Sequence, residues 1–163
     1  MYRTNHAPSP FVLSAVDGTV TAYARASGAI AWTFRVPDGA MEYRHVTRLI
    51  ADGHRVVIVA ARMNEEGMFA NADGTAHVCC LDYETGRPLW HQPVKGGQNI
   101  NRFTATLLID GDQVFLAHAA VLTAFALETG QVLWVQKIDH VEVYRGVLPV
   151  ALAVAGAAEQ GDI

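Results

Sequence analysis

Short apolar runs separated by turn residues recur along the whole chain. The clearest set of four lies at residues 103–109, 113–118, 121–128 and 131–138. Asp110-Gly111-Asp112 and Glu128-Thr129-Gly130 divide them, and these residue types favour tight turns. Apolar and polar side chains alternate over residues 20–25, and no long stretch has helical periodicity. The pattern predicts an all-β chain of short strands.

A threefold internal repeat organises these runs. Each copy carries a glycine four residues before a tryptophan, at Gly28–Trp32, Gly86–Trp90 and Gly130–Trp134. An arginine follows each tryptophan by 12, 12 and 11 residues, at Arg44, Arg102 and Arg145. Two landmarks that repeat in phase argue against a chance repeat. Four short strands in roughly 45 residues are the signature of a β-propeller blade.

The repeat divides a single domain, residues 1–163, into three blades. We expect them at about residues 11–36, 43–94 and 101–138. The first blade lacks its innermost strand, whereas a fourth innermost strand is expected at about residues 144–154, with no strand after it. The sequence therefore predicts a propeller segment of three four-stranded blades, the first completed by a C-terminal strand.

Three blades are too few for a closed propeller, which has about 4–8. An open arc exposes sheet edges and apolar faces. A second copy gives six blades with twofold symmetry, the last strand of each chain completing the first blade of the other. We therefore expect a six-bladed homodimer. A different partner chain with its own blades is the alternative, and three copies give nine blades, outside the usual range.

Charge and composition exclude several classes of function. The net charge is −4 and the pI about 5.9, which argues against a nucleic-acid partner. The longest apolar stretch, residues 147–158, is interrupted by Pro149 and is shorter than the roughly 20 residues of a membrane span, and residues 1–10 do not resemble a secretory leader. Cys79 and Cys80 are the only cysteines, so we expect a cytoplasmic, disulfide-free protein.

The pattern small-x-Asp-x-x-Thr-Gly-x-x-x-Trp resembles the PQQ-like β-propeller repeat. The second copy matches it best, with Cys80, Asp82, Thr85, Gly86 and Trp90, whereas the first and third have Ala24 and Ala126 in place of the aspartate. The resemblance covers about residues 11–154. It implies that the tryptophan packs between neighbouring blades, so Trp32, Trp90 and Trp134 are expected to be buried. The family includes dehydrogenases, assembly factors and scaffolds.

Candidate chemistry is sparse. Dehydrogenases that resemble this repeat use a disulfide between adjacent cysteines, but Cys79 and Cys80 lie in one predicted strand, where neighbouring side chains point to opposite faces. Cys80 also occupies the position of Ala22 and Ala124, so both are interpreted as small core residues. The seven histidines lack metal-ligand spacing, and we expect no catalytic residues, metal or cofactor.

Two sets of residues are candidates for binding. Arg44, Arg102 and Arg145 precede the innermost strands, so a closed dimer places six arginines at one mouth of the channel, where they would attract carboxylates or phosphates. A structural role, bracing the loops through backbone carbonyls, is the favoured alternative. The insertion at residues 63–74 carries Glu65, Glu66, Met68 and Phe69 and is either a partner-binding loop or a tolerated insertion.

These features favour a non-enzymatic binding or scaffold module. The oligomeric propeller would present its loop-bearing face to a protein or a small anionic ligand, and its first partner is a second copy of itself. The alternatives are an enzyme or cofactor-binding protein that uses the central channel, and a purely structural ring. We expect neither a nucleic acid nor a membrane as partner.

Overall fold

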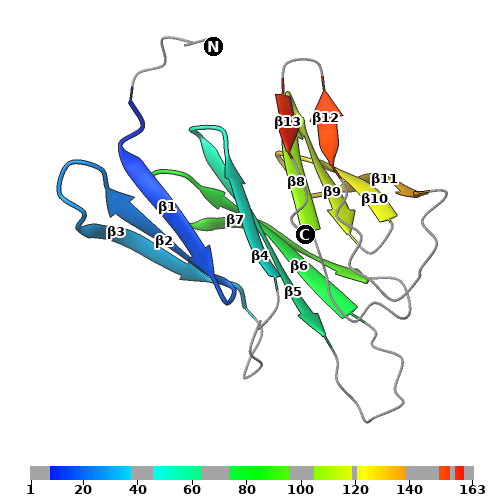
Figure 1. Cartoon of the computed structure of the whole chain (residues 1–163), viewed down its shortest axis with the longest axis horizontal. Coiled ribbons are helices and arrows are strands. Elements are labelled where there is room, and N and C mark those ends of the chain that lie inside the picture. Colours follow the sequence, from blue (N-terminus) through cyan, green and yellow to red (C-terminus); the bar gives the residue numbers. More distant parts are fainter. Residues whose placement is uncertain are drawn as a thin grey trace.

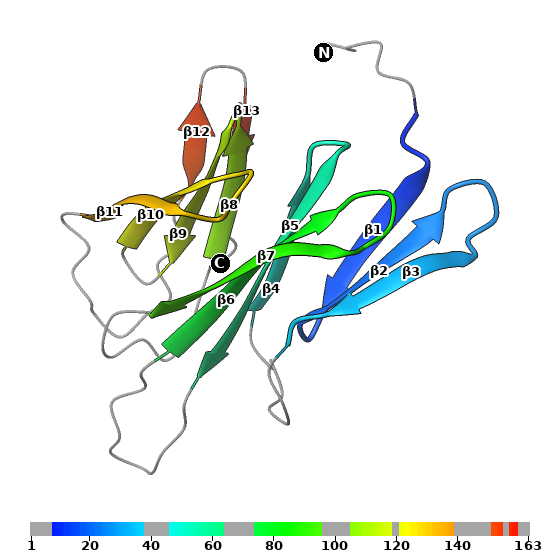
Figure 2. The ribbon, with the colours of Figure 1, turned by 180° about the vertical axis from the view of Figure 1, so that it is seen from behind.

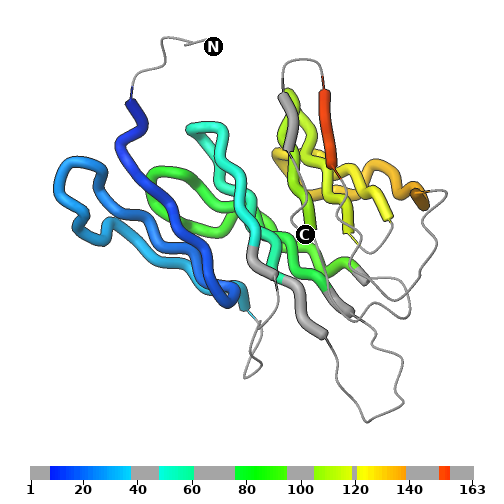
Figure 3. The backbone as a smooth tube through the Cα atoms, viewed as in Figure 1, coloured from blue at the N-terminus to red at the C-terminus, as the bar shows by residue number. Residues whose placement is uncertain are grey.

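The chain folds into antiparallel sheets that follow one another along the sequence. The computed structural model describes residues 8–37, 46–63, 74–95, 105–118, 121–138, 151–154 and 157–159. Within these residues, three larger sheets stand side by side in chain order (Figures 1 and 3), and a two-stranded hairpin follows the third. The predicted all-β architecture is confirmed, and the three larger sheets are referred to as blades.

The first blade has three strands, β1 (Phe11–Val16), β2 (Thr19–Ala24) and β3 (Ile30–Arg35), in the order β1-β2-β3. The tight turn between β1 and β2 uses Asp17 and Gly18, both with positive φ, as expected for a two-residue hairpin. The prediction of a first blade without an innermost strand is correct for the described residues.

The second blade comprises β4 (Val46–Ala51), β5 (Arg55–Met63), β6 (Gly74–Asp82) and β7 (Pro88–Lys95), hydrogen-bonded in that order. It lies between the other two blades, so both faces of β5 are buried over residues 56–60. This explains the uninterrupted apolar run of residues 56–60, because a strand covered on both sides has no polar face.

The third blade comprises β8 (Ala105–Asp110), β9 (Gln113–His118), β10 (Val121–Ala126) and β11 (Val132–Lys137), paired in the same order. Seen from behind, β3, β7 and β11 each form the last strand of their sheet (Figure 2). The first strand of each sheet lies at the opposite edge of that sheet, and there β4 contacts both β1 and β8.

The end of the chain differs from the prediction of a single closing strand. β12 (Leu152–Val154) lies within the expected strand, but it pairs with β13 (Ala157–Glu159) to form a hairpin. Both strands contact β8 of the third blade. The sequence pattern did not reveal this second strand, because alanine has a low strand propensity. β12 therefore has a partner within its own chain.

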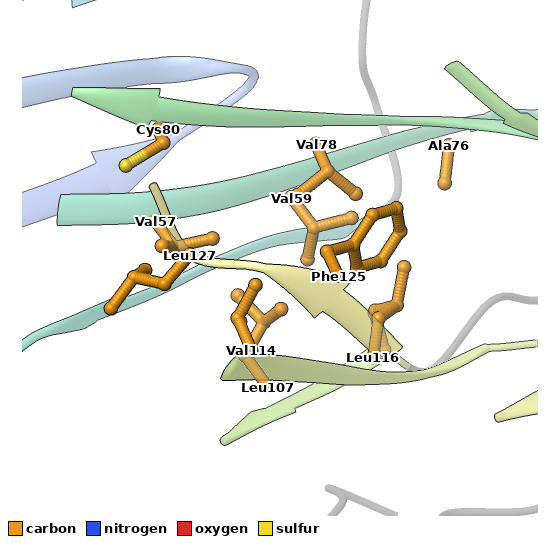
Figure 4. Close-up of a cluster of buried hydrophobic side chains, with 11 residues drawn as sticks. Val57, Val59, Ala76, Val78, Cys80, Leu107, Val114, Leu116, Phe125 and Leu127 are labelled. Atoms are coloured by element: carbon orange, nitrogen blue, oxygen red, sulfur yellow. The ribbon is translucent and has the colours of Figure 1, made fainter. Parts of the chain in front are cut away.

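Two apolar clusters join the blades. Side chains from the first and second blades form one cluster, which includes Val20, Trp32, Ile58 and Leu81. The second and third blades form the other, in which Phe125 and Leu116 pack on Val59 and Val78 (Figure 4). Most of the core therefore lies between sheets, and the stability of each blade depends on its neighbour.

A tryptophan crosses from the first blade to the second. The Trp32 side chain, 9% exposed, donates its Nε1–H to the carbonyl of Tyr83 at 3.1 Å. Its ring lies directly against Gly86, where a Cβ would be 2.5 Å from the indole. Only glycine permits this approach, and its φ of +69° also favours glycine.

The second and third blades repeat the same contact. Trp90 donates its Nε1–H to the Leu127 carbonyl at 2.8 Å, and a Cβ on Gly130 would be 2.5 Å from its indole. We call this arrangement of tryptophan, glycine and the carbonyl three residues before the glycine a blade joint. The spacing Gly-x-x-x-Trp is therefore explained by packing, since the glycine of each turn accommodates the tryptophan of the preceding blade.

The third tryptophan departs from the prediction. Trp134 on β11 is 42% exposed and stacks at a tilt on Phe115 of its own blade, with ring centroids 5.9 Å apart. The expectation that all three tryptophans are buried is wrong for Trp134 in the single chain, because no blade with a turn like those at Gly86 and Gly130 covers it among the described residues.

Candidate functional site

The residues singled out from the sequence lie outside the described part of the chain. These are Arg44, Arg102, Arg145, Glu65, Glu66, Met68 and Phe69. The strands that follow the first two arginines, β4 and β8, contact each other. The equivalent placement of the three arginines at one mouth of a channel therefore stays a prediction.

The strands that flank the predicted loop are longer than their counterparts. β5 and β6 have nine residues each and pair as far as Met63 and Gly74, whereas β1, β2, β9 and β10 have six. Three extra residues extend a hairpin by about 10 Å. The second blade thus carries the insertion at the tip of a longer hairpin.

A cleft of about 460 Å³ opens between the second and third blades. Asp52, His54 and Arg55 line it on one side, and Asp112 and Glu128 on the other. The Asp52 carboxylate accepts the backbone N–H groups of His54 and Arg55, and the Arg55 guanidinium pairs with Glu128 across the seam. An exposed pair of this kind contributes about 0–1 kcal/mol, so it adds little to the stability of the contact between the two blades.

The two cysteines have structural roles. Cys79 is buried against the first blade, and Cys80 against the third, because adjacent residues of β6 point to opposite faces. Burial raises the pKa of both thiols to about 12, so they are protonated at neutral pH. The interpretation of these residues as small core side chains is confirmed.

The turn of the second blade shows why the repeat contains Asp-x-x-Thr-Gly. The Asp82 carboxylate accepts the Thr85 hydroxyl at 2.7 Å and the Thr85 N–H at 2.9 Å. These hydrogen bonds lower the pKa of the Asp82 carboxyl. This aspartate therefore stabilises the turn that presents Gly86 to Trp32.

The fold brings together two histidines that sequence spacing did not connect. His77 on β6 and His91 on β7 stack with ring centroids 5.2 Å apart, and Nδ1 of His77 lies 2.9 Å from Nε2 of His91. Cross-strand register, rather than spacing along one element, produces this pair. Two imidazoles supply half of a four-coordinate zinc site, and no group of three or more potential ligands occurs in the described residues.

One histidine is buried in the third blade. His118 at the end of β9 is 2% exposed, and burial lowers the pKa of its imidazole to about 4. It is therefore neutral at physiological pH. His118 lies within an otherwise apolar run, residues 114–122, and this run is the signal from which its burial could have been predicted.

The repeat geometry agrees with a comparison with known families. A family model of the PQQ repeat, described as "Outer membrane protein assembly factor BamB", matches residues 16–159 and includes all three glycine–tryptophan pairs. A search of curated proteins found no match. Within the described residues, no helix is long and apolar enough to cross a membrane. The match covers most of the 163 residues, and the chain belongs to this family of PQQ-like β-propeller repeats.

Proposed function

We propose that the chain is a non-enzymatic binding or scaffold module. Two copies would complete a six-bladed ring, and the ring would present its loop-bearing face to a protein or a small anionic ligand. The family description supports a binding role, since it names an assembly factor. A cytoplasmic location stays a prediction from the sequence.

The observation that carries this proposal is the extended β5–β6 hairpin. Its strands are paired up to Met63 and Gly74, three residues beyond the length of the equivalent strands in the other two blades. A rigid two-stranded support reduces the conformational entropy that its tip loses on binding. The tip loop, residues 64–73, is the part of the chain that we assign to partner contact.

The same face is the proposed location of the three arginines. The starts of β4 and β8 lie at the opposite end of those strands from the β4–β5 and β8–β9 turns that line the cleft. Arginines at that end, repeated around a closed ring, would attract carboxylate or phosphate groups.

The strand proposed for exchange, β12, already forms a hairpin within its own chain. β12 already pairs with β13 through one of its edges, so exchange requires that β1 of another copy either pair with the opposite edge of β12 or replace β13. The free edge of β1 gives this pairing its driving force, because an unpaired edge strand is a template for further pairing. Exchange is accordingly proposed as the final step of assembly.

The experiment replaces residues 64–73 by Asp-Gly, the turn that closes β1–β2. The variant is expected to retain its circular dichroism spectrum and its oligomeric mass. When crosslinked in the source cells, wild type should capture a protein that the variant does not capture. If wild type and variant retain the same proteins, the loop is not the contact surface.

A second experiment tests anion binding, with inorganic phosphate and citrate as probes. Calorimetric titration of wild type should give saturable binding that weakens when Arg102 is replaced by glutamine and is unaffected by replacing residues 64–73. Absence of saturable binding to either probe would leave the arginines with the structural role alone.

A further inference from the structure

The outer faces of the first and third blades carry the two separate halves of a blade joint. Gly28 in the first blade and Trp134 in the third correspond to the glycine and the tryptophan that meet in both joints within the chain. We propose that a second copy of this chain docks on the first by placing its Trp134 over Gly28, with the indole N–H donating to the Arg25 carbonyl.

The receiving turn has the same conformation as the two occupied ones. Gly28 has a φ of +71°, as does Gly130, and the N–H of Gly28 bonds to the Ala24 carbonyl at 2.8 Å. The N–H groups of Gly86 and Gly130 make the equivalent bonds at 2.9 and 2.8 Å. A Cβ at Gly28 would meet nothing within 4 Å, so the place filled by an indole at the other two turns is open here.

The acceptor carbonyl is also fixed in place. In the two occupied joints the acceptors are Tyr83 and Leu127, each three residues before the glycine, and Arg25 is the third member of this set. The Arg25 N–H bonds to the Pro10 carbonyl at 2.8 Å, just as the Tyr83 and Leu127 amides bond to carbonyls immediately before β5 and β9. The backbone that would accept the indole hydrogen bond is therefore pre-formed.

The donating half on β11 is built like its two counterparts. Trp134 pairs across the sheet with Ala124, and a register shift follows between Ala124 and Phe125. The pairs Ala22–Trp32 and Cys80–Trp90 are followed by the same shift. The bulge therefore has the same position relative to the tryptophan in all three blades, but Trp134 stays 42% exposed.

The face around Gly28 has the apolar residues that a neighbouring blade would cover. Val12 and Val16 are 58% and 64% exposed and occupy the β1 positions that correspond to Val56 and Ala60 of β5. Val56 and Ala60 are fully buried by the first blade. A second copy is the occupant that we assign, because each copy supplies both halves of a joint that the chain already forms twice with its own residues.

This inference rests on the proposed ring and gives its interface. A contact between different surfaces of two identical chains closes only if the rotation between copies brings the last copy back to the first. Using the joint twice between two three-bladed chains gives six equivalent joints around one axis, within the range of about 4–8 blades. Docking through Trp134 and Gly28 precedes strand exchange and does not require it.

The test compares three variants of the full chain by native mass spectrometry and sedimentation. Trp134→Ala removes the donating half. Gly28→Asn blocks the receiving half while preserving the turn, because asparagine tolerates positive φ and space is open around Gly28. Gly111→Asn, at a φ of +56° with equal space but away from the joint, is the matched control.

Wild type and Gly111→Asn are expected to have twice the 17.6 kDa mass of the chain. The dimer affinity of both joint variants should be about 30-fold lower or more, as for substitution of a hot-spot residue. An equimolar mixture of Trp134→Ala with Gly28→Asn should form a one-to-one dimer more strongly than either alone, since the mixture restores one intact joint. A wild-type dimer that is insensitive to both variants overturns the joint but keeps the ring. A monomeric wild type at high micromolar concentration overturns both.

Discussion

The close approach of Trp90 to Gly130 makes a quantitative prediction for Gly130→Ala. The added methyl group would be 2.5 Å from Cδ2 and 2.6 Å from Cε3 of the indole, so the ring must move. Its movement strains the packing by about 1–3 kcal/mol and weakens the Nε1–H bond to Leu127, worth about 1 kcal/mol. Alanine at positive φ adds about 1–2 kcal/mol. We expect a total loss of about 3–6 kcal/mol.

Gly111→Ala isolates the contact from the backbone cost. Gly111 has a φ of +56° in the same blade, and nothing lies within 4 Å of its Cβ position, so this variant should lose only about 1–2 kcal/mol. Urea unfolding followed by circular dichroism measures both changes. Equal losses of stability for the two variants would show that the glycine is required by the turn alone, and the explanation of the Gly-x-x-x-Trp spacing by packing would fail.

Three further predictions concern titratable groups. His118 has a folded pKa of about 4 against 6.5 as the ordinary value, so stability should fall by about 3 kcal/mol as pH drops from 6.5 to 4, because only the unfolded state binds the proton; a His118→Gln variant that retains the full slope would contradict this. The lowered pKa of Asp82 implies that Asp82→Asn destabilises at neutral pH and that the difference vanishes as pH falls below about 3.8 through the folded pKa; a pH-independent difference in urea midpoint refutes a role for the charge. Cys79 and Cys80 should react with Ellman's reagent at pH 8 only on unfolding, and rapid labelling of the native chain would contradict their burial.

Local patterns were sufficient to predict most strands. The runs at 113–118 and 121–128 correspond closely to β9 and β10, because glycine-containing turns bound strands that are short and apolar. The repeat also predicted that the first blade lacks its innermost strand, and the described residues of this blade form three strands. These features depend on interactions between residues close in sequence, which the pattern records directly.

Contacts between blades were less predictable. The resemblance to the PQQ-like repeat implied that tryptophans pack between blades. It did not show that, among the described residues, no further blade covers Trp134 or that Gly28 is an open receiving turn, because both depend on which faces meet. The His77–His91 pair arises from cross-strand register, and β13 has no β-branched or aromatic residue to mark it as a strand. Such features are set by tertiary packing rather than by local preference.

The most direct test of the central claim is exchange of the indole N–H protons, followed by NMR. The chain has three tryptophans, so each indole signal can be assigned by substitution. The signals of Trp32 and Trp90 should be protected at all concentrations, because both donate to backbone carbonyls within the chain. The Trp134 signal should be protected where the chain is assembled and should lose protection on dilution. A Trp134 indole that exchanges as fast in the assembled protein as in the diluted one would contradict closure through the third joint.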